Sequence, residues 1–237
     1  MKNLLQIFFC VIILLNINAC AKYTVVATKE IQTSITPVQS LEVLKSGNQR
    51  FITKKERLYD YHKQEEKTAN GQFPIASVVS CMDSRAIPEI IFNLGIGDIF
   101  DVRVAGEVIM PEVLGSLEYG AVVAGSKYIL VVGHTHCGAV KGACDHVNVG
   151  NITALVHDIE PVLANIDEKG ERNSKNEAYV EKVAHANVLY QIQQIKEKSP
   201  ILKNLIETGK IGILGAMLNI ETGKVEFFDT RSVYEYH

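Results

Sequence analysis

Several residue types and patterns are scarce or absent in this chain of 237 residues, and each shortage argues against a class of protein. Tryptophan is absent, which argues against a site built on an indole ring. The five cysteines are an odd number and too few for a disulfide scaffold, although they are enough for a metal site. Lys and Arg number 24 against 27 Asp and Glu, whereas a sequence-independent nucleic-acid binder needs a strong basic excess. We therefore expect no nucleic acid among the partners.

The apolar segment near the start, residues 4–15, is too short to cross a bilayer, for which about 20 residues are needed. Its length matches the hydrophobic region of a secretory signal. It is followed by Ile17, Asn18, Ala19 and Cys20, which resemble the lipobox of bacterial lipoproteins with Ile17 in place of the usual leucine. This start therefore predicts a lipoprotein-like signal peptide.

The signal divides the chain into three parts. We expect residues 1–19 to be removed and Cys20 to become a lipid-carrying first residue, which predicts an exported bacterial protein that is periplasmic or anchored to a membrane as a lipoprotein. Plain secretion with cleavage nearby and an uncleaved anchor are the alternatives. Residues 20–36 show no clear helical period and are expected to be a tether, and residues 37–237 are expected to form one domain.

The domain alternates between strand-like and helix-like segments. The continuous apolar run at residues 127–132 is typical of a strand buried on both faces. Strands at 75–80, 98–104, 127–132, 211–218 and 225–228 are expected between helices at 40–51, 54–67, 88–93, 111–125, 138–144, 152–163 and 175–198. This order predicts an α/β fold with a central, mostly parallel sheet flanked by helices.

Two short motifs follow expected strands and carry metal-binding side chains. Residues 81–85 read Cys-Met-Asp-Ser-Arg, and residues 133–138 read Gly-His-Thr-His-Cys-Gly. Parallel strands bring such positions together at the carboxyl edge of a sheet. Cys81, His134 and Cys137 form a ligand set suited to Zn²⁺, and three protein ligands leave a fourth position for water, as in catalytic zinc sites.

A closed structural site completed by Cys144 is the alternative, and it would leave no position for water. Cys144 lies two helical turns after Cys137, about 10 Å along a helix axis. We therefore expect Cys144 to be a small buried residue instead.

Further motifs make the chain similar to the β-class carbonic anhydrases over residues 40–229. They are Ser-Gly-Asn-Gln-Arg-Phe at 46–51, Gly-Gln-Phe-Pro at 71–74, Gly-Asp-Ile-Phe at 97–100, Arg-Val-Ala-Gly at 103–106, Gly-Ser-Leu-Glu-Tyr at 115–119, His-Cys-Gly-Ala-Val-Lys-Gly at 136–142, Gly-Ala at 215–216 and Glu-Thr-Gly-Lys-Val at 221–225. The resemblance implies a catalytic domain with one Zn²⁺ per subunit. It also implies reversible hydration of CO2 to bicarbonate and a proton by zinc-bound hydroxide. Because two thiolates cancel the charge of the ion, we expect activity to rise on the alkaline side of neutral.

Asp83 and Arg85 are two residues apart, so one loop can direct both side chains toward the metal. The resemblance implies a dyad in which Asp83 accepts a hydrogen bond from the nucleophile and Arg85 holds the carboxylate. In a second, closed state of the family, Asp83 replaces the water on zinc and Arg85 is freed. An ordinary surface ion pair is the alternative interpretation.

The resemblance also assigns a substrate pocket that a neighbouring subunit completes in part. Its residues are Gln72, Phe100, Ala105, Tyr119 and Gly138. The family implies a homodimer or homotetramer in which the N-terminal helices embrace a partner subunit. Plain core packing is the alternative for the two aromatic residues.

One position departs from the family, and two other functions fit the same ligands. Glu107 stands where the family usually has asparagine, and its effect on the rate is open. Hydrolysis of CS2 or COS would use the same ligand set and would depend on the access tunnel. A zinc-binding protein without catalysis is the rival of another class, against which the intact dyad argues.

Overall fold

A computed structural model describes residues 22–229, and its strands form one five-stranded sheet in the order β2-β1-β3-β4-β5. The strands are β1 (Ala76–Ser80), β2 (Ile99–Arg103), β3 (Tyr128–His134), β4 (Gly212–Leu218) and β5 (Val225–Phe227). The first four pair in parallel, and β5 pairs antiparallel with β4. The expected α/β fold with a mostly parallel sheet is confirmed, and each expected strand is present.

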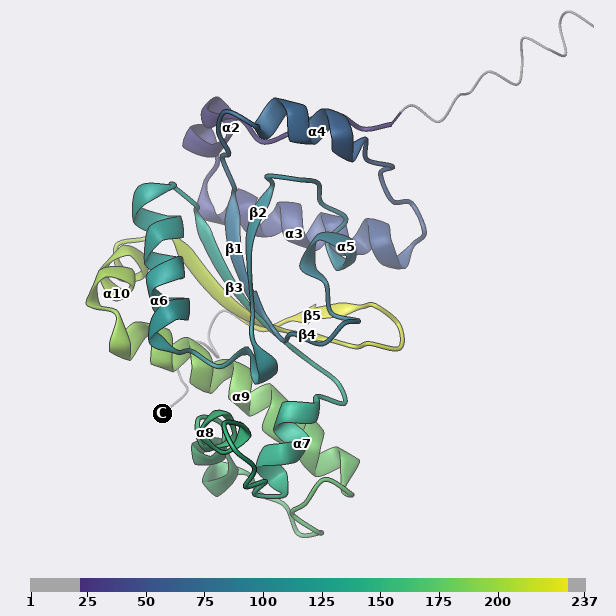
Figure 1. The fold of residues 1–237 in the computed structure, drawn as a ribbon, viewed down its shortest axis with the longest axis vertical. Helices are drawn as coiled ribbons and strands as arrows, with labels where there is room; N and C mark the ends of the chain where they lie inside the picture. The colour runs from purple at the N-terminus through teal and green to yellow at the C-terminus, as the bar shows by residue number, and fades with distance from the viewer. Residues whose placement is uncertain (1–21, 230–237) are drawn as a thin grey trace, which may run out of the picture.

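Helices cover both faces of this sheet (Figure 1). They are α2 (Lys29–Ser34), α3 (Pro37–Ile52), α4 (Tyr61–Thr68), α5 (Pro88–Ile91), α6 (Pro111–Glu118), α7 (Gly138–Cys144), α8 (Ile152–His157), α9 (Glu177–Lys198) and α10 (Pro200–Glu207), with short helical turns at Ala105–Glu107 (η1), Tyr119–Val123 (η2) and Glu160–Asn165 (η3). Helix α3 lies on one face and α9 on the other. The sheet is therefore the middle of three layers.

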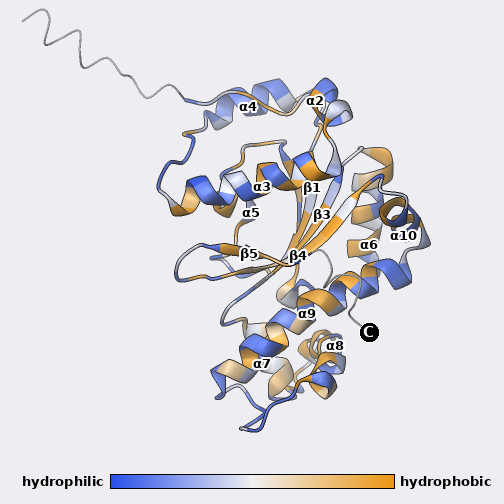
Figure 2. Ribbon diagram, turned by 180° about the vertical axis from the view of Figure 1, so that it is seen from behind, coloured by the Kyte–Doolittle hydropathy of each residue, from blue (hydrophilic) through white to orange (hydrophobic). Residues whose placement is uncertain are grey.

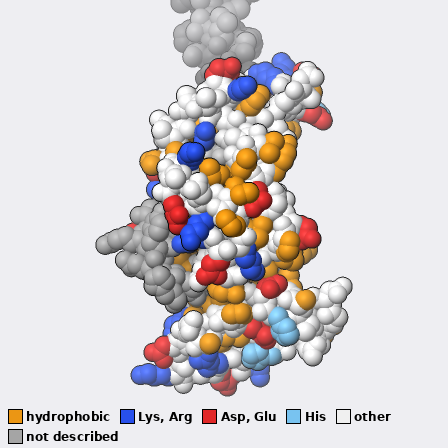
Figure 3. Space-filling view, turned by 90° about the vertical axis from the view of Figure 1, so that its left-hand side faces the viewer, with side chains coloured by type: hydrophobic (Ala, Val, Ile, Leu, Met, Phe, Trp, Pro, Cys, Tyr) orange, Lys and Arg blue, Asp and Glu red, His pale blue; other side chains and the backbone are white. Residues whose placement is uncertain are grey.

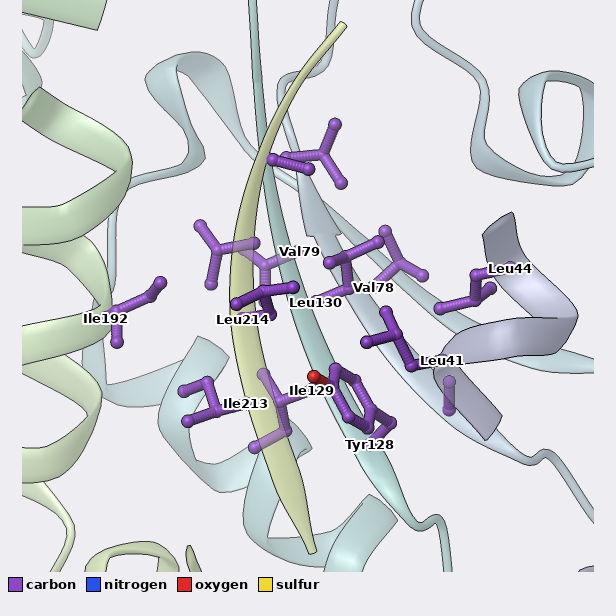
Figure 4. Close-up of a cluster of buried hydrophobic side chains, with 14 of the residues drawn as sticks. Leu41, Leu44, Val78, Val79, Tyr128, Ile129, Leu130, Ile192, Ile213 and Leu214 are labelled. Carbon is purple, nitrogen blue, oxygen red and sulfur yellow. The ribbon is translucent and has the colours of Figure 1, made fainter. Parts of the chain in front are cut away.

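The core forms where these layers meet. Every residue of β1 and β3 is buried, and the strands are mostly coloured as hydrophobic in Figure 2. Leu41 and Leu44, one turn apart on α3, pack against one face of the sheet, while Ile192 of α9 approaches the other (Figure 4). Burying one such side chain contributes about 1.5–3 kcal/mol. These contacts hold the carboxyl ends of β1 and β3 side by side.

The predicted tether at residues 20–36 contains an ordered helix. Thr28 caps α2 by accepting a hydrogen bond from the Ile31 amide. The buried Gln32 side chain donates to the Pro74 carbonyl at 2.7 Å, so this segment packs against the domain. Six residues are too few to show a helical period, which explains why the sequence pattern did not indicate α2.

Other helix boundaries also differ from the prediction. Helix α3 begins at Pro37 because Thr36 and Gln39 form a capping box. Helix α4 begins only after the Asp60 cap. The expected helix at 152–163 is divided into α8 and η3, and α10 was not expected. Side-chain hydrogen bonds at the caps set the starts of α3, α4 and α10, and apolar periodicity does not report them.

Within residues 22–229, no helix combines the length and apolar character needed to cross a membrane. The expected signal peptide at 1–19 and its neighbour Cys20 lie outside the described residues.

Candidate active site and metal centre

The three expected zinc ligands meet at the carboxyl edge of the sheet. Cys81 directly follows β1, His134 is the last residue of β3, and Cys137 precedes α7. Because β1 and β3 pair in parallel, their carboxyl ends are neighbours. One ligand atom from each residue lies within 4.8 Å of the others, and all three side chains are buried. Cys144 is not part of this group, so the closed four-ligand alternative is not formed.

His134 is oriented with one ring nitrogen free for a metal. Its Nδ1 lies 2.9 Å from the Thr135 carbonyl oxygen, which can only accept, so Nδ1 carries the proton. Nε2 is buried and has no hydrogen-bond partner among the described residues. An unpaired buried polar atom costs about 1–3 kcal/mol, and a metal ion at this position removes that cost.

The two thiols also fit a cation. The neighbouring Cys137 thiol, as a hydrogen-bond donor, lowers the pKa of Cys81 to about 4. The proximity of Cys81 and burial raise the pKa of Cys137 well above its usual range. Two thiols this close do not both ionise unless a cation lies between them. The chemistry of this donor set therefore fits Zn²⁺, which binds cysteine as the thiolate.

Asp83 and Arg85 form a bidentate ion pair beside the ligands. Arg85 donates from Nε to Asp83 Oδ1 at 2.9 Å and from Nη2 to Oδ2 at 2.7 Å, and its backbone amide donates to Oδ1 at 2.9 Å. These bonds hold the pKa of Asp83 well below its usual range, so the carboxylate is charged at neutral pH. Asp83 Oδ2 lies 3.9 Å from His134 Nε2, so the carboxylate is placed beside the ring nitrogen that is free for the metal.

Arg103 is a site residue whose role the sequence analysis missed. Its Nε donates to the Cys81 carbonyl at 3.2 Å, and its Nη2 donates to the Asp83 carbonyl at 2.6 Å. Arg103 ends β2 and lies opposite Ser80 in the parallel ladder, so it reaches the loop that leaves β1. The signal available in the sequence was its place at the start of the 103–106 motif, at the end of an expected strand.

Two of the five expected pocket residues lie next to the zinc ligands of this chain. Ala105 begins the η1 turn, in which the Gly106 amide donates to Cys81 Sγ at 3.4 Å. Gly138 follows Cys137 and begins α7, where backbone N–H groups are free to face an anion. Both positions are consistent with the expected pocket.

The other three expected pocket residues lie elsewhere. Gln72, Phe100 and Tyr119 line one surface depression together, and the rings of Phe100 and Tyr119 meet edge-on with centroids 6.3 Å apart. Phe100 of β2 pairs with Ser77 of β1. The four-residue advance along the chain from Ser77 to Cys81 spans about 13 Å. This depression is therefore displaced along the sheet from the ligands of the same chain.

Glu107 is buried near the ligands. Its Oε1 accepts a hydrogen bond from Asn187 at 2.9 Å, while Oε2 is buried and has no partner in the described part of the chain. Burial and the proximity of the Cys81 thiolate raise the pKa of Glu107 to about 8. The departure from the family pattern therefore places an additional carboxyl group close to the metal site.

Known proteins are similar to this chain in both sequence and fold. The sequence profile of the family described as carbonic anhydrase matches residues 76–225. Carbonic anhydrase 2 of Mycobacterium tuberculosis is 32% identical over 198 residues, which cover 81% of this chain and 93% of that protein. The structure of the β-carbonic anhydrase CcaA has a TM-score of 0.62 and 26% identity, covering 80% of this chain and 87% of that one. The chain belongs to the β-class carbonic anhydrase family.

Other carbonic anhydrases show the same relation. The carbonic anhydrase of Synechococcus elongatus is 32% identical over 174 residues, covering 68% of this chain and 62% of that protein. The Coccomyxa β-carbonic anhydrase, solved in complex with acetazolamide, shares the fold with a TM-score of 0.63 at 24% identity, covering 79% and 84% of the two chains. Membership confirms the expected activity, the reversible hydration of CO2 to bicarbonate, and the expected zinc cofactor.

Proposed function

We propose that Asp83 and Arg85 orient the nucleophile in the hydration of CO2, the reaction that this zinc enzyme catalyses. When bound by Cys81, His134 and Cys137, the zinc supplies a Lewis acid that lowers the pKa of a water in its fourth position. The observation that carries the proposed dyad is the bidentate pair, because it fixes a charged carboxylate beside the free nitrogen of His134.

Asp83 has one task in this arrangement. An ionised carboxylate can only accept hydrogen bonds, so a hydroxyl group beside it donates its hydrogen to Asp83 and points a lone pair elsewhere. That lone pair would be available to the carbon of CO2. Arg85 prevents the carboxylate from turning away, since its bonds use both oxygen atoms. This pairing supports the open state that the resemblance implies, in which Asp83 is not a metal ligand.

The backbone around Asp83 is held as firmly as the side chain. Arg103 bonds to the carbonyl groups of Cys81 and Asp83, so one guanidinium fixes the loop that carries both a ligand and the dyad carboxylate. We assign Arg103 the role of a positioning residue, because it bonds to the backbone and not to the reacting atoms.

A second copy of the chain completes the substrate pocket in this proposal. Gln72, Phe100 and Tyr119 lie together but displaced from their own zinc ligands, which fits a contribution to the site of a partner subunit. Tyr119, Val122 and Val123 are 55–69% exposed on η2. The side of the molecule that carries α6 and α10 shows hydrophobic side chains among charged ones (Figure 3). A homodimer, or a homotetramer built from dimers, would cover this surface.

Export is a separate proposal that rests on the start of the sequence. Residues 4–15 have the length of a signal-sequence hydrophobic region, and Cys20 follows a lipobox-like tripeptide. We expect Cys20 to carry lipid and to anchor the enzyme to a membrane. Radiolabelled palmitate should label the full chain expressed in a bacterium but not the Cys20→Ala variant; equal labelling of both would contradict the anchor.

Stopped-flow CO2 hydration tests the function. The purified domain should hydrate CO2, lose activity after zinc is removed with dipicolinate, and regain it when one equivalent of zinc is returned. Zinc binding without hydration would indicate a non-catalytic zinc protein. Hydrolysis of CS2 or COS without CO2 hydration would indicate a different substrate for the same site.

A further inference from the structure

Two amide side chains of α9 are buried behind the metal centre. Asn187 and Gln191 are 0% and 1% exposed, and they lie four residues apart, which places them on one face of the helix. Burying an amide without hydrogen bonds costs about 1–3 kcal/mol. Helix α9 packs against β3, β4, α7 and the η1 turn, so it is close to both ligand-bearing segments (Figure 1).

The two amides bond to each other and to the η1 region. Asn187 Nδ2 donates to the Gly106 carbonyl and to Glu107 Oε1, both at 2.9 Å. Gln191 Nε2 donates to Asn187 Oδ1 at 3.0 Å, and Gln191 Oε1 accepts from the Ile109 amide at 2.9 Å. All of these bonds are buried, so water does not compete with them.

The turn that they hold has an unfavourable backbone. Gly106 has a φ of 65° and Glu107 a φ of 46°, so two consecutive residues adopt the left-handed region. A Cβ at position 106 would lie 2.7 Å from Ile159 Cδ1 and 3.1 Å from Ala139 Cβ, which together with the positive φ favours glycine here. For Glu107, which has a Cβ, this conformation costs about 1–3 kcal/mol and persists only where surrounding contacts enforce it. The amides of Asn187 and Gln191 supply such contacts.

The same turn contacts a zinc ligand. The Gly106 amide donates to Cys81 Sγ at 3.4 Å, while the Gly106 carbonyl accepts from Asn187. A chain of hydrogen bonds therefore runs from Gln191 through Asn187 and Gly106 to the sulfur of Cys81. Removing a group that bonds directly to a metal ligand typically changes metal affinity or activity by about 10- to 100-fold, and the Gly106 amide is such a group.

We propose that Asn187 and Gln191 are positioning residues for the metal centre, which hold the η1 turn so that its amide stays on Cys81 and the Glu107 carboxyl stays in place. The inference rests on the zinc site of the proposed function and adds residues that do not touch the metal. The two amides are separated from Cys81 by more than 100 positions, so only the fold brings them together.

The test measures the rate at which zinc leaves the holoenzyme. Gln191→Met keeps the volume and removes the amide, and Asn187→Ala removes the central link. The matched control is Gln194→Met, because Gln194 is also a buried amide on α9 but, within residues 22–229, its side chain bonds only to Glu197 of the same helix. Ile192→Ala is a second control that weakens the packing of the same helix on the sheet.

Zinc transfer to 4-(2-pyridylazo)resorcinol is followed well below the unfolding temperature of each variant. We expect Gln191→Met and Asn187→Ala to release zinc about 10- to 100-fold faster than wild type, and both controls to stay within about threefold. If Asn187→Ala does not fold, Gln191→Met decides. Equal release from Gln191→Met and wild type, or equally fast release from Ile192→Ala, would overturn the proposal. A wild-type protein that binds no zinc would contradict the proposed function itself.

Discussion

Replacing Asp83 with asparagine tests the dyad at a single atom. The carboxylate accepts three hydrogen bonds from Arg85, at 2.7–2.9 Å. Asparagine has nearly the same shape but replaces one acceptor oxygen with an NH2 donor. The variant must therefore lose either a bond to the Arg85 guanidinium or the acceptor that faces the nucleophile.

The size of the effect follows from these bonds. A hydrogen bond to a charged group contributes about 1.5–3 kcal/mol, and each 1.36 kcal/mol of transition-state stabilisation is a factor of ten in rate. We therefore expect Asp83→Asn to lower kcat about 10- to 100-fold. Zinc content should stay at one per chain, because Asp83 is bonded to Arg85 and is not a ligand in this arrangement.

The assay is stopped-flow CO2 hydration with a pH indicator, together with zinc analysis of the same sample. The control is Asp145→Asn, which removes the same charge at a position far along the chain from the dyad. Asp145 is exposed and accepts a hydrogen bond from the Ser174 amide. That variant should retain wild-type kcat. A kcat within twofold of wild type for Asp83→Asn would refute the orienting role, and loss of zinc together with activity would show that Asp83 is a metal ligand.

Further outcomes follow from the same site. Cys137→Ser should lose zinc and CO2 hydration together, as measured by metal analysis and stopped flow; an active, zinc-loaded variant would contradict the ligand assignment. The hydration rate should rise between pH 7 and 9 because two thiolates offset the charge of the metal, and a rate that stays flat down to acid pH would contradict this. In the zinc-free protein, Glu107 has a folded pKa of about 8, above its usual value of 4.5, so between these values only the folded state keeps the proton. The unfolding free energy of the zinc-free protein should therefore fall as pH rises through this range, by at most about 1.4 kcal/mol per pH unit. Glu107→Gln should reduce this dependence on pH, as measured by urea titrations. Val122→Lys should dissociate the proposed dimer in sedimentation experiments, whereas Val149→Lys, at a similarly exposed valine, should not; a dimeric Val122→Lys would place the interface elsewhere.

The sheet and the ligand cluster were predictable because their signals are local. Continuous apolar runs marked β1 and β3. Cys81 and His134 lie at the ends of those strands, and Cys137 follows β3 by three residues. Once the strands are parallel neighbours, their carboxyl ends must meet. A short sequence window therefore contained enough information to place the metal ligands together.

Other features depend on contacts that no local pattern reports. The start of α3 is set by the capping box of Thr36 and Gln39, and α2 is too short to show a period. Arg103 reaches the Cys81 loop only because β2 pairs with β1. The role of Asn187 was also invisible in the sequence, since the two groups to which its side chain donates lie about 80 positions away.

X-ray absorption at the zinc edge of the purified wild-type enzyme tests the central claim most directly. The geometry of Cys81, His134 and Cys137 predicts one zinc per chain with two sulfur ligands at about 2.3 Å and two nitrogen or oxygen ligands at about 2.0–2.2 Å. Three or four sulfur ligands, a shell of nitrogen and oxygen alone, or a protein without bound zinc would contradict it.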